Sequence, residues 1–383
     1  MIPQRPKHLS RLAAVLWLVA SFSLACRSDS LRAPHSEQAQ QYQVAEFLAG
    51  HTLPAESVFY ARTQKPFYQR HQAYMLKLKE QIFSRHVSHI EEWKSANQFK
   101  ATSRTAVYLL SGADVPNLMT FFPDCKQYLM VALQPSAEIG DLATLSDGEL
   151  DRSLEKLRVT MQDIAKRNYF RSAVLRKSKT NLGLPGIAPI LLAFLATLNK
   201  EVVAYENVLL DDSGRLIRTE TDSATRTSGF RIYFREPGDA EVKTLVYLSL
   251  KVDPNFISTQ KPEGKLFATF GQVNLMLKAA IYLFHEDAYR NLATELLKKS
   301  DLVLQDDSGI PAHYFPIEEW KFSLFGVYSR SAKLNDLKRY KLQEDLRELY
   351  AQSAQPLNFA FGYGSWSGRS NLMWASRVKN PSK

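Results

Sequence analysis

Two apolar runs, at 105–110 and 128–133, stand out in the pattern of hydrophobic and polar positions. Both contain β-branched and aromatic residues, which favour strands. Between them lie the polar turn Ser111-Gly112-Ala113-Asp114 and a short segment, 116–122, with helical character. The pattern predicts strand, turn, short helix and strand, with Ser111 and Asp114 at the carboxyl end of the first strand. In open α/β sheets, ligands bind at that end of the strands.

Longer periodic segments complete the prediction. Apolar residues at helical spacing, or nearly continuous, predict helices over 69–99, 146–169, 187–198, 270–285, 289–299 and 334–350. Alternating or short apolar runs predict strands over 202–210, 216–218, 230–234, 243–250, 302–304, 311–315 and 320–327. We therefore expect a single large α/β domain over 55–378, with a mixed parallel and antiparallel sheet flanked by helices.

The N-terminus has the pattern of an export signal. Arg5, Lys7 and Arg11 form a basic region before the apolar stretch 12–25, which is too short to span a membrane and ends in small residues. We expect a signal peptide over 1–25.

The residues that end this signal indicate how it is processed. Ser23-Leu24-Ala25-Cys26 resembles the lipobox of bacterial lipoproteins, although Ser23 stands where Leu is usual. The resemblance implies that Cys26 carries a lipid (palmitate among its fatty acids) that anchors the protein to a bacterial membrane. The polar composition of the stretch that follows predicts a flexible tether over 26–54. The same small residues also fit ordinary secretory cleavage, which leaves a soluble periplasmic protein as the alternative localisation.

Charge and cysteine content narrow the class of protein. The net charge is +10, and loss of the three basic residues of the signal leaves +7. No run of five basic residues occurs, so nucleic-acid binding is not indicated, whereas attraction to an anionic envelope polymer is. After Cys26 only Cys125 remains, so no internal disulfide can form. Its place before an apolar run favours a buried residue over a nucleophile.

A second candidate site lies at Asp306-Asp307-Ser308-Gly309, where adjacent carboxylates could serve as acid and base or hold a cation. The same tetrapeptide at 211–214 separates two predicted strands and has ordinary hairpin chemistry. The 306–309 copy is followed closely by His313, Tyr314 and Trp320, which makes a site more plausible there.

Three weaker signals have simpler explanations. His86, His89 and Glu92 share one helix face and could bind a metal, but surface histidines are the simpler interpretation, and we expect no metal and no cofactor. The Gly- and aromatic-rich segment 361–369 could line a sugar or phosphate site or a close-packed strand end. His285 is interpreted as a rim histidine.

Several motifs in this order resemble the signature of an uncharacterised family of exported bacterial proteins, over about residues 60–375. They are 111–135, 186–195, LKAAIYLFH (277–285), LQDDSGIP (304–311) and FGYGSW (361–366). The resemblance implies no activity. It marks Ser111, Gly112, Asp114 and the 306–311 loop as recurrent positions. Members often carry Glu where this chain has Gln134, so an acid–base role at that position is not expected here.

We therefore expect a non-catalytic, envelope-anchored lipoprotein that binds a polar ligand or a protein partner. Asp114 and Ser111 would form the site with Gly112 and with the loop residues Asp306, Ser308 and His313. The alternative is a hydrolase or transferase that acts on an envelope substrate with Asp114 or Asp307 as base and Ser111 as a ligand-orienting hydroxyl. A purely structural interaction protein is the third possibility.

Overall fold

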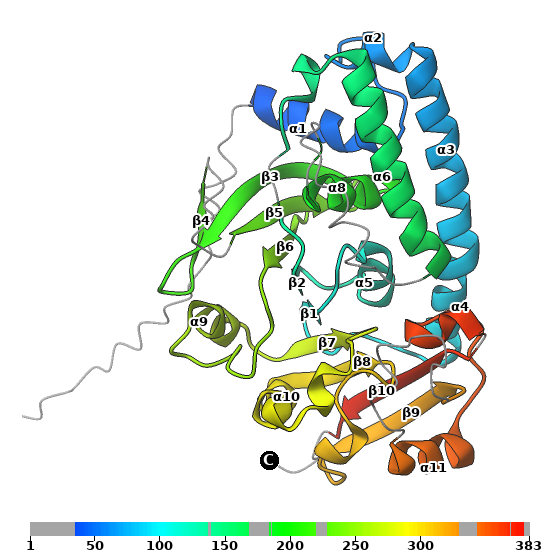
Figure 1. The fold of residues 1–383 in the computed structure, drawn as a ribbon, viewed down its shortest axis with the longest axis vertical. Coiled ribbons are helices and arrows are strands. Elements are labelled where there is room, and N and C mark those ends of the chain that lie inside the picture. Colours follow the sequence, from blue (N-terminus) through cyan, green and yellow to red (C-terminus); the bar gives the residue numbers. More distant parts are fainter. Residues whose placement is uncertain are drawn as a thin grey trace, which may run out of the picture.

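The computed structural model describes residues 35–136, 139–167, 184, 186–219, 228–328, 343–367 and 369–378. A ten-stranded sheet runs through these residues in the order β4-β3-β5-β6-β2-β1-β7-β8-β10-β9 (Figure 1). The strands are β1 (Thr105–Leu109), β2 (Gln127–Ala132), β3 (Glu201–Leu210), β4 (Leu216–Arg218), β5 (Ser228–Arg235), β6 (Lys243–Ser249), β7 (Val273–Leu277), β8 (Ser300–Gln305), β9 (Trp320–Gly326) and β10 (Asn371–Arg377).

The sheet is parallel in its centre and antiparallel at both ends. The neighbours β6, β2, β1, β7 and β8 run parallel. The β4-β3-β5 meander joins β6 in antiparallel fashion, and β10 and β9 do the same beyond β8. The carboxyl ends of five strands therefore meet at one edge. The predicted α/β domain with a mixed sheet is confirmed.

Burial along the strands explains this arrangement. Every residue of β1 and of β7 is buried, as expected for parallel strands covered on both faces. Residues of β3 instead alternate between buried and half-buried positions, as in an antiparallel strand with one covered face.

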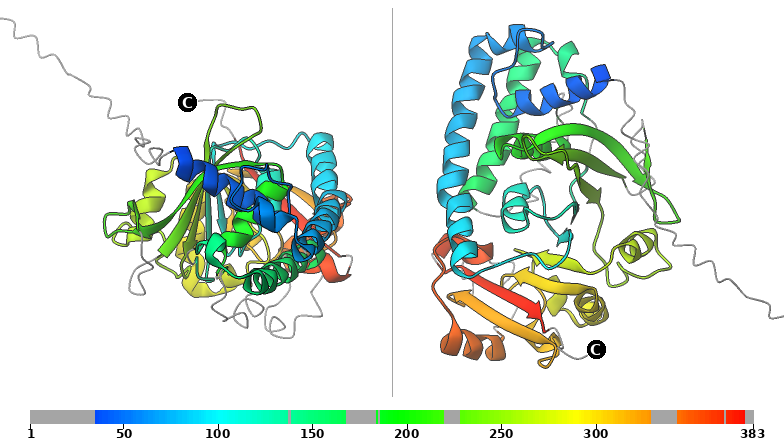
Figure 2. Two further views of the ribbon diagram at one scale, coloured as in Figure 1. Left: turned by 90° about the horizontal axis from the view of Figure 1, so that it is seen from above. Right: turned by 180° about the vertical axis from the view of Figure 1, so that it is seen from behind.

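Helices cover the two faces of the sheet and form two cores. The first core contains residues of α1 (His35–Leu48), α3 (Pro66–Ile82), α4 (Ser88–Ala96), α5 (Val115–Phe121), α6 (Asp147–Arg167) and α8 (Ala188–Thr197). The second contains residues of α9 (Pro262–Thr269), α10 (Arg290–Lys298) and α11 (Glu344–Ser353). The helices α3 and α6 run side by side along one flank of the molecule (Figures 1 and 2). No helix of the described residues is long and apolar enough to cross a membrane.

The connections on either side of β1 make this strand a topological switch point. The β1–β2 connection contains α5, whose side chains belong to the first core. The β7–β8 connection contains α10, on the second core, and leads away from β1 in the opposite direction. Crevices at such points are where ligands bind in open α/β sheets.

The β1–α5–β2 unit agrees with the sequence prediction, and a capping residue begins its helix. Asp114 is the N-cap of α5, and its carboxylate accepts a hydrogen bond from the backbone N–H of Asn117 at 3.4 Å. Pro116 lies in the first turn, where its missing N–H costs nothing. The predicted helices at 69–99, 146–169, 187–198 and 289–299 are likewise confirmed.

The expected flexible tether over 26–54 is wrong for its second half. Residues 35–48 form α1, which lies against β3 and α8. Phe47 is fully buried and stacks between Phe59 and Tyr68, with ring centroids 4.7 and 4.5 Å apart. Although most residues of this segment are polar, a short apolar group around Phe47 packs on the sheet. The first half of the tether and the signal segment lie outside the described residues.

The predicted helix over 270–285 is also wrong. Its first part is the strand β7, and a 3₁₀ turn, Leu283–His285, closes it. A short apolar run cannot be distinguished by periodicity from a buried helix, and β7 is buried on both faces.

Three further differences are local. Residues 311–315, predicted as a strand, contain the 3₁₀ turn Ala312–Tyr314. The helix predicted at 334–350 corresponds to α11 from Glu344 onward, and its first part lies mostly outside the described residues. The helix α9 and the strand β10 were not predicted.

Candidate functional site

Four polar side chains come together at the carboxyl edge of the parallel strands, on the face covered by α5. We call Tyr108, Asp114, Lys278 and Asp306 the edge cluster. They come from β1, the α5 N-cap and the residues directly after β7 and β8. Each is at most 1% exposed. A buried group of this kind is stable only if its charges and hydrogen bonds are paired.

Asp114 lies at the centre of the cluster. One carboxylate oxygen forms an ion pair with Nζ of Lys278 and accepts a hydrogen bond from the Tyr108 hydroxyl at 2.8 Å. The other accepts from the Asn117 side-chain amide at 2.8 Å as well as from its backbone N–H. Helix capping and ion pairing thus occur together at Asp114.

Lys278 is a buried cation at the switch point. Burial lowers its pKa, and the neighbouring carboxylates of Asp114 and Asp306 oppose this effect. Its Nζ also lies 5.9 Å from the centroid of the Phe361 ring. The lysine therefore links the β1 turn to the loop after β8, so the two stretches singled out in the sequence lie near one another.

Asp306 accepts hydrogen bonds from three segments. One oxygen accepts from the backbone N–H of Ala279 at 3.2 Å and from the N–H and hydroxyl of Ser308. The other accepts from the backbone N–H of Tyr363 at 3.1 Å. Burial, together with the charge of Asp307, raises its pKa to about 7. A carboxyl group with a pKa near neutrality is suited to proton transfer.

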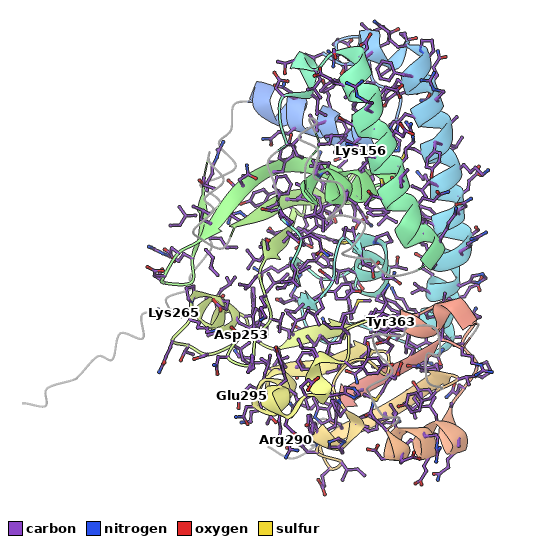
Figure 3. All side chains as sticks on the ribbon, viewed as in Figure 1. Lys156, Asp253, Lys265, Arg290, Glu295 and Tyr363 are labelled. Carbon is purple, nitrogen blue, oxygen red and sulfur yellow. The ribbon has the colours of Figure 1, made fainter. Side chains whose placement is uncertain are left out.

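A short 3₁₀ helix, Gly362–Ser367, lies over Asp306, and we call it the covering turn. Gly362 has φ +64°, and a Cβ at this position would overlap the Asp306 carboxylate. Tyr363, labelled in Figure 3, donates its hydroxyl to the carbonyl oxygen of Ala279 at 2.9 Å. The Gly- and aromatic-rich segment of the sequence therefore closes the cluster.

Asp307 has a different set of partners. Its carboxylate accepts hydrogen bonds from the Tyr282 hydroxyl at 2.6 Å and from the Asn371 amide at 2.9 Å. Burial raises its pKa. Tyr282 in turn stacks on Tyr363, with centroids 6.2 Å apart. The adjacent carboxylates are thus held by separate partners, and Asp306 is the one whose charge, with that of Asp114, acts on the pKa of Lys278.

The loops after β1 and β7 contain strained backbone. Leu110 has φ +60°, and Ala279, Ile281 and Tyr282 have φ between +52° and +56°. These values are uncommon for residues with a side chain, and for β-branched Ile281 they are outliers. Ile281 is nevertheless 47% exposed. Strain of this kind, about 1–3 kcal/mol for each residue, occurs mainly at functional sites.

The remaining predicted site residues divide between the edge and the surface. Ser111 is buried and donates its hydroxyl to the carbonyl oxygen of Gly112 at 3.1 Å. Ser308 is buried beside Asp306. His313 is instead exposed, with Nδ1 3.9 Å from the Asp345 carboxylate on α11. It therefore lies outside the edge cluster.

The simpler interpretations of two other motifs are confirmed. Asp211–Gly214 is a surface turn between β3 and β4, in which Asp211 accepts from the Ser213 N–H at 2.9 Å. Cys125 is buried, and burial raises its pKa to about 12, which disfavours the thiolate.

Of the two histidines His86 and His89, both expected at the surface, only His89 lies there. His89 lies near the surface, 3.4 Å from Glu92, but His86 is only 6% exposed. No group of metal-binding side chains occurs among the residues that the structure describes.

Lys278 and Tyr108 are the site residues that sequence reasoning missed. Tyr108 was assigned to the apolar strand, and Lys278 to the wrong predicted helix. A lysine that ends an apolar strand at a sheet's carboxyl edge would have been a signal, but only with the strand correctly assigned.

An open surface depression of about 580 Å³ lies near α4 and the loop that leads into β1. It is at the opposite end of β1 from the edge cluster.

No family model matches the chain, and no curated protein matches it either.

Proposed function

We propose that this chain is a lipid-anchored protein of the bacterial cell envelope that binds a polar ligand at the edge cluster. The binding role is favoured over catalysis because the carboxylate of Asp114 is engaged by Lys278, Tyr108 and Asn117. A carboxylate held in this way is a poor general base.

The observation that carries the proposal is the concentration of strain beside the cluster. Of the six non-glycine residues with positive φ in the described part of the chain, four lie in the loops after β1 and β7. Both loops adjoin the Asp114–Lys278 pair at the switch point. The strain of these loops must be offset by the surrounding structure, which is the behaviour of ligand-binding loops.

Burial of the cluster sets a condition on binding. Its side chains are closed over by the covering turn, so a ligand reaches them only when this turn moves. The hydrogen bonds from Tyr363 to Asp306 and to Ala279 are the contacts that such a movement breaks.

The proposed localisation in the cell envelope rests on the N-terminal sequence. The basic and apolar regions before Cys26, together with the motif order that resembles exported bacterial proteins, support export and lipidation. A positive net charge supports an anionic envelope polymer or a protein partner alongside the membrane.

Thermal shift measurements test the ligand proposal. N-acetylglucosamine and its β-1,4 oligomers serve as hydroxylated probes of envelope glycans. Binding to the folded state raises the midpoint with probe concentration. We expect this rise for the wild type and for the exposed Asp212→Asn variant, and its loss in Asp306→Asn. Equal rises in all three proteins, or none in the wild type, would refute binding of these sugars at the edge cluster.

Labelling with a radioactive fatty acid tests the anchor. The wild type should incorporate label and sediment with membranes, and Cys26→Ser should do neither. Label in the Cys26→Ser protein contradicts lipidation at this residue.

The raised pKa of Asp306 supports a second candidate, a hydrolase or transferase on an envelope substrate. A carboxyl group protonated near neutral pH can act as general acid. In this case Asp306→Asn abolishes turnover of a peptidoglycan fragment but retains binding, whereas the ligand-binding proposal expects no turnover from the wild type.

A further inference from the structure

A π-turn separates α3 from α4, and this turn holds a buried histidine. Between α3 and α4, residues Phe83–Val87 form one turn of π-helix that carries His86. The π-turn lies against α5, the helix capped by Asp114. Such single π-turns inside α-helices are frequent at functional sites, since the extra residue redirects one side chain.

The hydrogen bonding of His86 defines the state of its ring. Its Nε2 lies 2.9 Å from the carbonyl oxygen of Ala165 on α6. A carbonyl only accepts, so Nε2 carries the proton, and the ring's other nitrogen, Nδ1, presents a lone pair. Nδ1 is buried and has no hydrogen-bond partner within the described ranges. Buried polar atoms are almost always partnered, so a donor from outside these residues is expected there.

His86 is electrostatically close to the edge cluster. Burial lowers its pKa, so that the ring is neutral, and the charges of Lys278 and Asp114 act on it in opposite directions. His86 is only 6% exposed, and an additional charged donor buried beside Nδ1 would be costly. The missing donor is therefore an uncharged O–H or N–H group.

We propose that His86 is a binding residue of the edge site, whose Nδ1 accepts a hydrogen bond from a hydroxyl group of an uncharged, hydroxylated ligand of the sugar class. This inference rests on the proposed function, and it adds to the site a residue of the π-turn that packs against α5. It also makes the ligand a hydrogen-bond donor, in contrast to an anion that would pair with Lys278.

Two substitutions at His86 separate the roles of its nitrogens. In His86→Gln the side-chain amide can keep the bond to the Ala165 carbonyl but leaves the Nδ1 position empty. In His86→Asn the amide lies near the Nδ1 position and can still accept. We expect His86→Gln to weaken binding about three- to tenfold, the effect of one lost hydrogen bond, and His86→Asn to change it less.

His71→Gln is the matched control. His71 is also buried, and its Nε2 lies 3.0 Å from the carbonyl oxygen of Leu48. Its Nδ1, however, has a partner in Arg158 at 3.4 Å. Its substitution should alter stability without changing affinity.

Isothermal titration with N-acetylglucosamine and its β-1,4 oligomers provides the affinities. ¹⁵N NMR of the wild type follows the His86 ring, whose Nδ1 resonance should shift when the probe saturates the site. Equal affinities of wild type and His86→Gln would overturn the inference while leaving the proposed function intact. If His86→Gln does not fold, an unmoved Nδ1 resonance in the saturated wild type overturns it. Absence of binding to the wild type would overturn both. Binding of the oligomers but not the monosaccharide would identify a glycan chain as the source of the hydroxyl.

Discussion

At the level of single residues, Lys278 and Asp114 form a buried charge pair that neighbouring hydrogen bonds stabilise. The ion pair, the Tyr108 hydroxyl and the Asn117 amide together satisfy the carboxylate. Such a pair contributes little net stability relative to apolar residues, but removal of one partner leaves an uncompensated charge in the core.

We expect Lys278→Met to lower the free energy of unfolding by about 3–5 kcal/mol, because Asp114 loses its counter-ion in a buried place. The double variant Lys278→Met/Asp114→Asn should recover part of this loss. Urea unfolding measures both. Lys298→Met, whose side chain is 65% exposed in a pair with Glu295, is the control and should cost less than about 1 kcal/mol. Similar losses for the two lysine variants contradict the expectation.

Asp306 predicts a pH dependence of stability with a definite sign. Its pKa is about 7 in the folded protein, above the ordinary 3.8. Between these values the folded state holds a proton that the unfolded state has released, so the free energy of unfolding falls as the pH rises. The contribution is present in full below the ordinary pKa and is lost as the pH passes the folded one.

Urea unfolding at about pH 5 and about pH 8 tests this sign. The wild type should lose more stability than Asp306→Asn over this interval, since the variant has no carboxyl to titrate. The difference between the two proteins removes the contribution of all groups except those that interact with Asp306, among them Asp307 and Lys278. The exposed Asp212→Asn should follow the wild type. Parallel curves for wild type and Asp306→Asn would refute a raised pKa at this residue.

At the scale of elements, the covering turn depends on a glycine. Gly362 combines a positive φ with a backbone that lies directly against Asp306, so it needs both the conformational freedom and the small size of glycine. The position of Lys278 likewise depends on one element, the strand β7, because Lys278 directly follows it.

Gly362→Ala should be more destabilising than Gly238→Ala. Both glycines have positive φ, but a Cβ at Gly238 meets no atom within 4 Å, whereas one at Gly362 overlaps the Asp306 carboxylate. Strain alone costs about 1–2 kcal/mol, and the overlap adds to it. Denaturant midpoints provide the comparison, and equal losses would show that the turn shifts freely away from Asp306.

For the whole molecule, the continuous sheet joins two cores. Within β1, Ala106 and Tyr108 belong to the first core, and Val107 and Leu109 to the second. Loss of β1 from the sheet would therefore remove packed apolar residues from both cores. The described residues should therefore unfold as one cooperative unit.

Phe47→Ala in α1 and Leu296→Ala in α10 test this unit from opposite faces. Each should cost about 2–5 kcal/mol and shift a single transition, seen at the same midpoint by circular dichroism and by tryptophan fluorescence. Tyr42→Ala, at a 39% exposed position of α1, is the control and should change little. A biphasic transition in either core variant contradicts the single unit.

Elements whose signals are local could be predicted from the sequence alone. The β1–α5–β2 unit, the amphipathic helices and the Asp211–Gly214 turn follow from periodicity, capping and turn chemistry within a few residues. The sequence also pointed to Ser111, Asp114 and the 306–309 loop, because strand ends and clustered carboxylates are visible without a fold.

The contacts that these residues make follow from the three-dimensional packing of distant segments. The sheet order brought Lys278, directly after β7, into an ion pair with Asp114, and packing on the sheet made part of an apparent tether into α1. Burial then turned His86 from a surface histidine into an interior one. Pairing of distant strands and burial depend on contacts far apart in the chain, and a pattern along one segment contains no information about them.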